Sequence, residues 1–306
     1  MTKYFFRLKN DRPDLLAIIA IVLGIACMGF IPIFVRLSEV GSASTAIWRN
    51  IMAAPILLCF VMSLPSSQRP TQSSWTKLLI ISVIVTSFFS AATLYTSYVS
   101  FHITSVANAT LLSSLAPLFT ILLNLFFFKE KAYKIYFLCL LLAIIGMGFL
   151  IKDSLTINAD QLVGDGLSLV TAFLLACFFM MFKYIRQSLS SFWAVFMVNI
   201  ISLLFLFPIS WHFGEVFWPQ TSNGWWIIVG MAIVTTIIGM NLISYALAQL
   251  PTFFSSLTTM VQPVSAAFLA WIILGETISI DQFVGGFIIL STLFMAHKKP
   301  EVEQNS

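Results

Sequence analysis

Apolar residues run through the chain in long stretches that are separated by short polar breaks. A bilayer core of roughly 30 Å requires about 17–25 apolar residues per helix, and the sequence divides into ten segments of about this length. The breaks carry helix-ending residues, as in PSSQRPTQSS at 65–74 and GETISI at 275–280. The pattern predicts an all-α integral membrane protein with ten transmembrane helices. These helices are expected at residues 15–36, 45–64, 77–101, 105–128, 135–151, 164–183, 191–211, 224–248, 252–274 and 281–297.

The composition agrees with lipid as the solvent of this chain. Hydrophobic residues make up 59% of the 306 positions and charged residues only 9%, whereas a globular domain carries roughly 25% charged residues. The first apolar run, from Leu15 to Val35, is too long for a signal peptide, so we expect it to be retained. The four cysteines lie inside apolar runs without metal-ligand spacing, which predicts packing roles and no metal or cofactor.

The basic residues predict the orientation in the membrane, because short cytoplasmic loops carry the excess of Lys and Arg. With the N-terminus inside, 13 of the 16 basic residues are cytoplasmic, and the exceptions are Arg36, Arg49 and Lys152. We therefore expect a multi-pass protein of the cytoplasmic (inner) membrane of a bacterium. Residues 1–14 and the tail 299–306 are both predicted to be cytoplasmic.

One unusual helix occurs twice in the chain. PLFTILLNLFFFKE at Pro117–Glu130 and PVSAAFLAWIILGE at Pro263–Glu276 both begin with proline and end with glutamate, 146 residues apart. ACMGFIPIFVR at 26–36 likewise matches ACFFMMFKYIR at 176–186, with an offset of 150. A chance match of apolar helices is the alternative, but landmarks at nearly one spacing favour an internal duplication.

The duplication predicts two five-helix repeats, residues 15–152 and residues 164–298. Because five is an odd number, the second repeat enters the membrane from the opposite side, so the repeats are inverted. Inverted repeats are typical of secondary transporters, with the substrate site near the midplane where the repeats meet.

Several segments also resemble the EamA-type transporters of the drug/metabolite transporter superfamily. These are SEVGSASTAIWRNIMAAPIL at 38–57, SVANATLLSSLAPLFTILLNLFFFKEK at 105–131, GDGLSLVTAFLLACFFMMFKYIR at 164–186 and LGE at 274–276. The resemblance covers essentially the whole chain and implies a ten-helix carrier of small metabolites, a class that includes amino-acid exporters, with a central cavity lined by both repeats. The chain departs from the family at FKE, 128–130, where a glycine often precedes the glutamate.

Polar residues at helical spacing identify faces that avoid lipid. Tyr95 and Tyr98 lie on such a stripe, and the offset of 146 maps them onto Asn241 and Ser244. Small hydroxyl residues also serve close helix packing, whereas bulky polar groups require partners or water in the bilayer. The predicted cavity and substrate-binding residues are Arg49, Tyr95, Tyr98, Asn108, Ser113, Asn241, Tyr245, Thr259 and Gln262.

Prolines within the spans predict kinks, because proline removes one intrahelical hydrogen bond and clashes with the preceding turn. Pro32, Pro117 and Pro263 are the predicted kink positions. The sequence leaves open whether they act as gating hinges or as fixed bends.

Arg49 lies about one turn inside the second predicted span. An arginine at a helix centre costs about 2.5–3.5 kcal/mol on insertion scales. Its fork geometry suits a substrate carboxylate or phosphate. Alternatively, Arg49 reaches the membrane interface or pairs with Glu39 to hold the outer loop, and the sequence leaves both readings open.

The acidic residues all lie at predicted span ends or in loops, which argues against a buried-acid proton relay. No P-loop, HExxH motif or nucleophile elbow is present, which argues against ATP-driven transport and hydrolysis. We expect a non-enzymatic carrier or exporter of a small polar or amphipathic metabolite, an amino acid or related compound, working by alternating access along the substrate gradient or by exchange. It is expected to have lipid and substrate but no nucleic acid as partners, as a monomer or weak homodimer.

Three alternatives remain at this stage. The chain could be an intramembrane enzyme acting on lipid, an uptake carrier for a nucleoside-type metabolite such as S-adenosylmethionine, or a channel. An enzyme requires a compact catalytic cluster, which the sequence does not display. A channel more often relies on oligomeric symmetry than on an internal inverted repeat.

The predicted topology can be tested with a reporter fused after His297. An even number of spans and a cytoplasmic N-terminus place this position in the cytoplasm, so an alkaline phosphatase fusion there should be inactive and a green fluorescent protein fusion should fluoresce. The opposite result would contradict the inverted-repeat topology.

Overall fold

The computed structural model describes residues 15–65, 69–70, 75–104, 106–123, 134–151, 161–250, 252–274 and 280–297. Every regular element within these ranges is a helix, so the predicted all-α class is confirmed. The landmarks Glu130, Lys152 and Glu276, and the predicted tails 1–14 and 299–306, lie outside the described residues.

Six of the helical rods are long and apolar enough to cross a membrane. Four of them are single helices: α3 (Ser42–Ser63), α4 (Lys77–Ile103), α8 (Leu162–Arg186) and α9 (Ser191–His212). The other two are composite: α1 (Leu15–Met28) continues into α2 (Ile31–Leu37), and α10 (Ser222–Met231) continues through the π-helical segment η5 (Ala232–Met240) into α11 (Asn241–Leu247).

The remaining helices are shorter or interrupted. They are α5 (Val106–Ser113), α6 (Ala116–Leu123), α7 (Lys134–Ile151), α12 (Thr252–Leu257), the 3₁₀ turn η6 (Thr258–Met260), α13 (Val261–Leu274) and α14 (Ile280–His297). They occupy the positions at which the sequence predicts the fourth, fifth, ninth and tenth spans.

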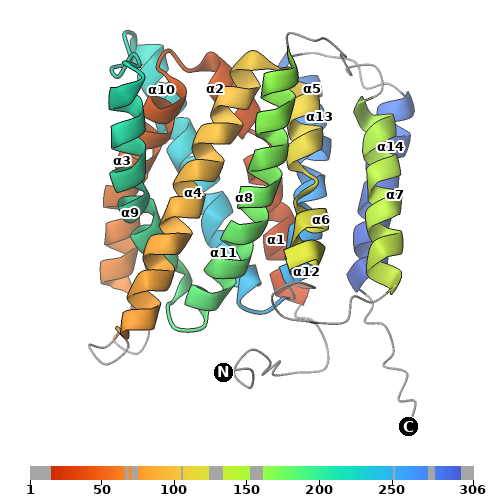
Figure 1. Cartoon of the computed structure of the whole chain (residues 1–306), viewed down its shortest axis with the longest axis horizontal. Coiled ribbons are helices and arrows are strands. Elements are labelled where there is room, and N and C mark those ends of the chain that lie inside the picture. Colours follow the sequence, from red (N-terminus) through yellow and green to blue (C-terminus); the bar gives the residue numbers. More distant parts are fainter. Residues whose placement is uncertain are drawn as a thin grey trace.

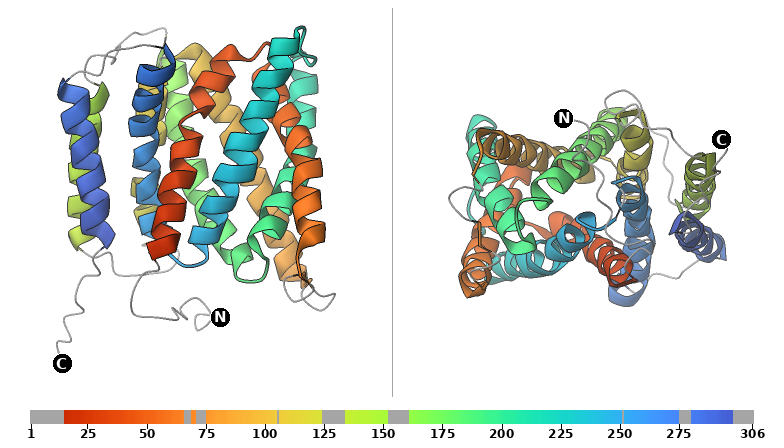
Figure 2. Two further views of the ribbon diagram at one scale, coloured as in Figure 1. Left: turned by 180° about the vertical axis from the view of Figure 1, so that it is seen from behind. Right: turned by 90° about the horizontal axis from the view of Figure 1, so that it is seen from below.

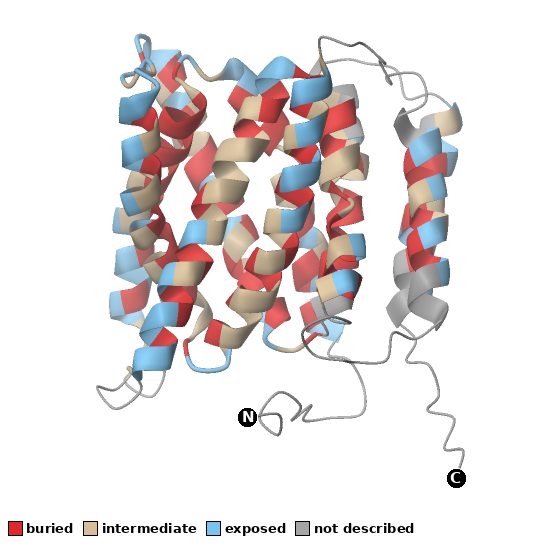
Figure 3. Ribbon diagram, viewed as in Figure 1, coloured by how far each residue is buried: buried red, intermediate tan, exposed pale blue. Residues whose placement is uncertain are grey.

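The helices pack as one bundle of roughly parallel rods (Figure 1). α4 packs on α8, α3 on α9, α1 on α11 and η5, and α7 on α14. Seen end-on, the α7–α14 pair lies at one side of the bundle (Figure 2). Buried positions face between the rods and exposed apolar positions face outward, as a lipid solvent requires (Figure 3).

Glycine permits a close helix crossing between α1 and η5. A Cβ atom on Gly24 would lie 2.9 Å from the Gly239 carbonyl oxygen, and one on Gly239 would lie 3.2 Å from the Gly24 carbonyl oxygen. The two backbones therefore approach at a distance that only small residues allow, as in other membrane helix pairs.

The prolines coincide with the interruptions. Pro32 follows the break between α1 and α2, Pro117 is the second residue of α6, and Pro263 follows the 3₁₀ turn η6. Pro32 lacks the N–H that would bond the carbonyl of Met28 four residues earlier, and the Gln262 side-chain amide donates to that carbonyl instead, at 3.3 Å. The hinge role predicted for these prolines stays a prediction.

Two glutamates cap helices across one end of the bundle. Glu215 accepts backbone hydrogen bonds from Ala43 and Ser44 (3.1 and 2.8 Å) at the start of α3. Glu39 accepts from the Gln220 and Thr221 backbone (2.9 and 3.0 Å) just before α10, and hydrogen bonds from the Thr221 hydroxyl and backbone lower the pKa of this carboxyl. These hydrogen bonds connect the segment between α2 and α3 with the loop after α9.

We expect Glu215→Ala to destabilise the protein by about 1–2 kcal/mol, because it leaves two N-terminal N–H groups of α3 without their acceptor. Glu215→Gln keeps one acceptor oxygen and should cost less. Thermal unfolding in detergent measures both. Gln220→Ala, in the same loop, changes only an exposed side chain and should stay within about 0.5 kcal/mol of wild type; an equal loss there would contradict the capping role.

Candidate functional site

A cavity of about 140 Å³ lies in the middle of the bundle. Its wall contains residues from α1, α2, α3, α4 and α5 of the first predicted repeat and from α8, α9, η5, α11, η6 and α13 of the second. The described residues of α7 and α14 take no part in it. The cavity is therefore built by both halves of the chain.

Arg49 of α3 places the only charged side chain on the described part of the cavity wall. The side chain is 8% exposed. Its Nε and Nη2 donate to Asn50 Oδ1 (3.3 and 3.0 Å), and its Nη1 donates to the hydroxyl of Tyr98 (3.0 Å). Both acceptors in the described structure are neutral, so the positive charge is oriented without being neutralised.

Asn50 links this arginine to the second half of the chain. Its Nδ2 donates to Ser202 Oγ (2.9 Å) and to the Asn199 carbonyl (3.4 Å), while Asn199 Nδ2 donates to the Asn50 carbonyl (2.8 Å). The two asparagines thus exchange equivalent bonds between α3 and α9. The Asn50 amide is therefore bonded through both its oxygen and its nitrogen, and a satisfied amide of this kind fixes the geometry of a buried polar network.

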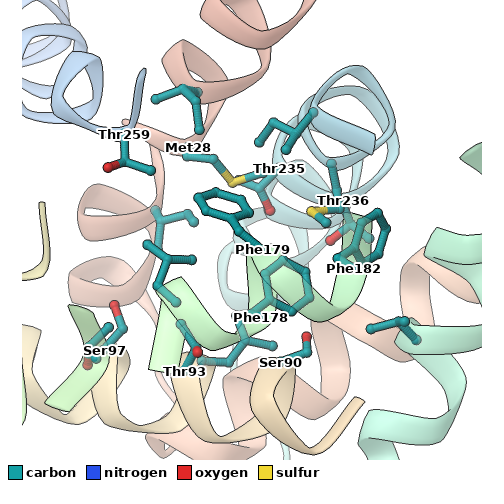
Figure 4. Close-up of a pocket in the computed structure, with 18 of the residues that line it drawn as sticks. Met28, Ser90, Thr93, Ser97, Phe178, Phe179, Phe182, Thr235, Thr236 and Thr259 are labelled. Atoms are coloured by element: carbon teal, nitrogen blue, oxygen red, sulfur yellow. The ribbon is translucent and has the colours of Figure 1, made fainter. Parts of the chain in front are cut away.

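An aromatic surface forms another part of the wall. Phe178, Phe179 and Phe182 project from α8 between the hydroxyl residues of α4 and those of η5 (Figure 4). The ring centroids of Phe178 and Phe182 are 5.2 Å apart. The cavity therefore offers an apolar surface as well as a fixed cation.

Two threonine hydroxyls on the wall have unused hydrogen-bonding capacity. Thr93 Oγ1 of α4 and Thr236 Oγ1 of η5 are buried and have no partner among the described residues. An unsatisfied buried hydroxyl costs about 1–3 kcal/mol. A polar ligand in the cavity could supply the missing partners.

The described acidic residues lie away from this cavity. Asp165 at the start of α8 accepts from Thr104 (2.7 Å) and Asn108 (3.4 Å), and Glu39 and Glu215 cap helices at the end of the bundle. The carboxylate of Glu39 is thus engaged with the loop before α10, and the pairing with Arg49 that the sequence leaves open does not occur in the structure.

The structure brings five of the predicted site residues together on the cavity wall. They are Arg49, Tyr98, Ser113, Thr259 and Gln262. The hydroxyls of Ser113 and Thr259 bond backbone carbonyls in their own helical segments, to Ala109 and Ser256. Arg49 and Tyr98 therefore carry most of the polar character that the prediction assigned to this wall.

Four predicted residues lie elsewhere, which corrects the expected wall. Tyr95 stacks on Phe213, with ring centroids 6.1 Å apart. Asn108 bonds Asp165, Asn241 donates to the Ile237 carbonyl (2.9 Å), and Tyr245 is 39% exposed on the outside of the bundle.

The reason for the correction is helical phase. In α4 the wall runs through Ser90, Thr93, Leu94, Ser97 and Tyr98. Before α11, the π-helical segment η5 replaces i→i+4 bonds by i→i+5 bonds and so rotates the following residues. The prediction assumed an uninterrupted α-helix and therefore assigned Asn241 and Tyr245 to the wall. In the structure the wall residues of this span are Thr235, Thr236, Met240 and Ile243.

Sequence reasoning missed Asn50, Asn199 and the α8 phenylalanines. The phenylalanines are indistinguishable from lipid-facing residues in an apolar run. The asparagines did carry a signal, since two amides at an offset of 149 occupy equivalent places in the predicted second and seventh spans.

An apolar helical bundle around a cavity with a buried cation is the architecture of a multi-pass membrane transporter. The chain belongs to the EamA-like transporter family, whose model matches residues 15–152 and again residues 162–297. The resemblance noted in the sequence is therefore confirmed.

Two relatives agree with this assignment, and a solved structure shares the fold. An "Uncharacterized transporter" of Archaeoglobus fulgidus is 25% identical over 282 residues, covering 92% of this chain and 96% of the relative. "Uncharacterized transporter YxxF" of Bacillus subtilis is 26% identical over 279 residues, covering 90% and 87%. A solved structure titled "Crystal structure of protein" shares the fold, with a TM-score of 0.72 at 12% identity over 92% of this chain and 96% of that one.

The cavity wall can be tested by cysteine labelling after Cys27, Cys59, Cys139 and Cys177 are replaced by serine. Ser97→Cys should react with a water-soluble maleimide, because Ser97 lines the cavity. Ser87→Cys on the same helix is the matched control and should stay unlabelled, because Ser87 is fully buried outside the described cavity wall. Equal labelling of both positions would contradict the assigned face of α4.

Proposed function

We propose that this protein is a carrier that moves a small anionic or zwitterionic metabolite with an apolar part, an amino acid or related compound, across the cytoplasmic membrane by alternating access. The observation that carries the proposal is Arg49: a buried guanidinium on a cavity wall, held only by neutral acceptors among the described residues. The aromatic surface of α8 suits the apolar part of such a substrate.

The electrostatics favour an anionic ligand. A charge in a low-dielectric interior is costly unless a partner offsets it. Arg49 is held inward by Asn50 and Tyr98, and Glu39 is engaged elsewhere. A substrate carboxylate would complete the hydrogen bonding of the guanidinium with charge-assisted bonds. This supports the substrate-binding reading of Arg49 over the anchoring one.

Inverted repeats are a common basis of alternating access, and equivalent contacts in the two halves of the chain support them. Arg36 at the end of α2 donates to the Phe101 and Thr104 carbonyls at the end of α4 (both 3.3 Å). Arg186, at the end of α8, likewise donates to the Ser244 carbonyl of α11 (2.7 Å). Each arginine thus binds the third predicted span of its own repeat from the first.

The direction of the second repeat is supported by Thr104. This residue ends α4, contacts Arg36 at the end of α2, and donates to Asp165 at the start of α8 (2.7 Å). The first span of the second half therefore starts at the face where the first span of the first half ends. We accordingly propose ten spans in two inverted repeats with both termini cytoplasmic, functioning as a monomer or weak homodimer.

The charged groups of the cavity wall bear on whether transport is coupled to protons. The cavity wall, as far as it is described, has no carboxylate that could carry a proton with the substrate. We therefore propose that transport follows the substrate gradient or proceeds by exchange. The same wall has no nucleophile with an adjacent base, which favours transport over catalysis on lipid.

The test begins with a thermal-shift screen of amino acids and related carboxylates on the purified protein, followed by counterflow in liposomes. For a carboxylate that binds, Arg49→Ala should reduce affinity about 10- to 100-fold, because a charge-assisted bond contributes about 1.5–3 kcal/mol. Arg49→Lys keeps the charge but loses the planar fork, so its loss should be clear but smaller.

Folded yield separates the two roles of Arg49. Normal yield with reduced binding supports the substrate role, whereas lost yield in both variants would indicate an anchoring role. Normal yield with normal binding in Arg49→Ala would remove Arg49 from the binding site. Proton flux strictly tied to substrate flux would contradict the proposed coupling.

A further inference from the structure

Asn50 takes the place at which an ion-pair partner of Arg49 would be expected. Its Oδ1 accepts from both Nε and Nη2 of the guanidinium (3.3 and 3.0 Å). One neutral oxygen thus occupies the Nε and Nη2 edge of the guanidinium, the edge at which a carboxylate can bind arginine. Asn50 is 1% exposed, so the contact is buried in the protein and is not a surface encounter.

The hydrogen-bond network determines which way the Asn50 amide faces. The Asn199 carbonyl can only accept a hydrogen bond, so the Nδ2 of Asn50 must face it, and Oδ1 must face Arg49. Ser202 Oγ accepts from the same Nδ2 at 2.9 Å and itself donates to the Asn199 carbonyl at 2.8 Å. An aspartate in this place could not donate to the Asn199 carbonyl.

The second half of the chain has an equivalent asparagine but no charged residue beside it. Asn199 is the equivalent of Asn50 at an offset of 149 and returns its hydrogen bond at 2.8 Å. The same offset places Val198 where the first half has Arg49, and Val198 also lines the cavity. Each half of the chain therefore contributes one asparagine to the pair, whereas only the first half has a charged residue next to it.

We propose that Asn50 is a specificity-determining, positioning residue that orients Arg49 with a neutral oxygen, so that its charge is neutralised only by an anionic group of the substrate. The inference rests on the proposed function. An amide at this position makes the cavity selective for anionic over neutral ligands, and a carboxylate at this position would satisfy Arg49 internally and remove that selectivity.

The test compares phenylacetate with phenylacetamide, which differ in charge but hardly in size and combine a polar group with an apolar ring. Binding to the purified full-length protein is measured by titration calorimetry. The wild type should bind phenylacetate more tightly than phenylacetamide. In Asn50→Asp the affinity for phenylacetate should fall at least tenfold, while the affinity for phenylacetamide should change less than threefold.

Asn199→Asp is the matched control. It introduces the same carboxylate at the equivalent position and breaks the equivalent carbonyl bond, but none of the bonds found for Arg49 involves the Asn199 side chain in the described structure. Its phenylacetate affinity should fall distinctly less than that of Asn50→Asp. Equal losses would show a general effect of negative charge in the cavity and would overturn the role of Asn50.

Arg49→Gln separates failure of the inference from failure of the proposed function. Lost anion preference in Arg49→Gln together with wild-type preference in Asn50→Asp would overturn the inference and leave the anion site standing. Retained preference in Arg49→Gln, or no preference in the wild type, would contradict the anion site and the inference with it.

Asn50→Ser keeps the test decisive if Asn50→Asp does not fold. The serine leaves the charge of Arg49 unneutralised but holds it less firmly, so preference for phenylacetate over phenylacetamide should persist while phenylacetate affinity falls about three- to tenfold. Wild-type affinity in Asn50→Ser would exclude the positioning role.

Discussion

A guanidinium buried among apolar helices must have its hydrogen bonds supplied by the protein, and much of the central architecture can be understood from that constraint. Asn50 and Tyr98 accept from Arg49, Asn50 in turn requires Asn199 and Ser202, and these residues join α3, α4 and α9. The interactions are strong because water is excluded, and for the same reason each unsatisfied member would be costly. The polar network thus joins three helices around the cavity, and its acceptors for Arg49 are all neutral.

The two halves of the chain are alike in the contacts that support the fold and differ in the contacts that define the site. Arg36 and Arg186 bond carbonyls at the ends of equivalent helices, and Asn50 and Asn199 exchange equivalent bonds. Arg49 and Val198, by contrast, occupy equivalent positions with opposite character. In the proposed carrier, the shared contacts would belong to a duplicated scaffold, and the difference at this one position would give the cavity its preference for an anionic ligand.

The presence of the helices was predictable from the sequence. An apolar segment that crosses a bilayer finds no water to bond its backbone, so it forms a helix whose hydrogen bonds are internal. Arg49 was predictable as a special residue for the related reason that a charge inside a span is costly. The face of each helix was predicted only in part: even in the regular helix α4, Tyr95 does not line the cavity. Tyr98 lies on the predicted wall of α4, whereas Asn241 and Tyr245 do not line the cavity because the π-helical segment η5 changes the phase before them. A local change of hydrogen-bond period leaves no mark in the pattern of polar residues.

The sequence by itself determined the helical class, the membrane as solvent and the presence of one arginine that requires an explanation, because each follows from composition, spacing or the cost of a single charge. The family was recognised from the resemblance of several segments to known members. Only the tertiary structure decided what satisfies that arginine. Glu39, an acid close to it along the chain, instead accepts from Thr221 before α10, while Asn50, its immediate neighbour, takes the place of the counter-ion. The phenylalanines of α8 face the cavity although their sequence reads as lipid-facing. These assignments depend on which helices meet and at what rotation, and that is set by packing between segments about 150 residues apart.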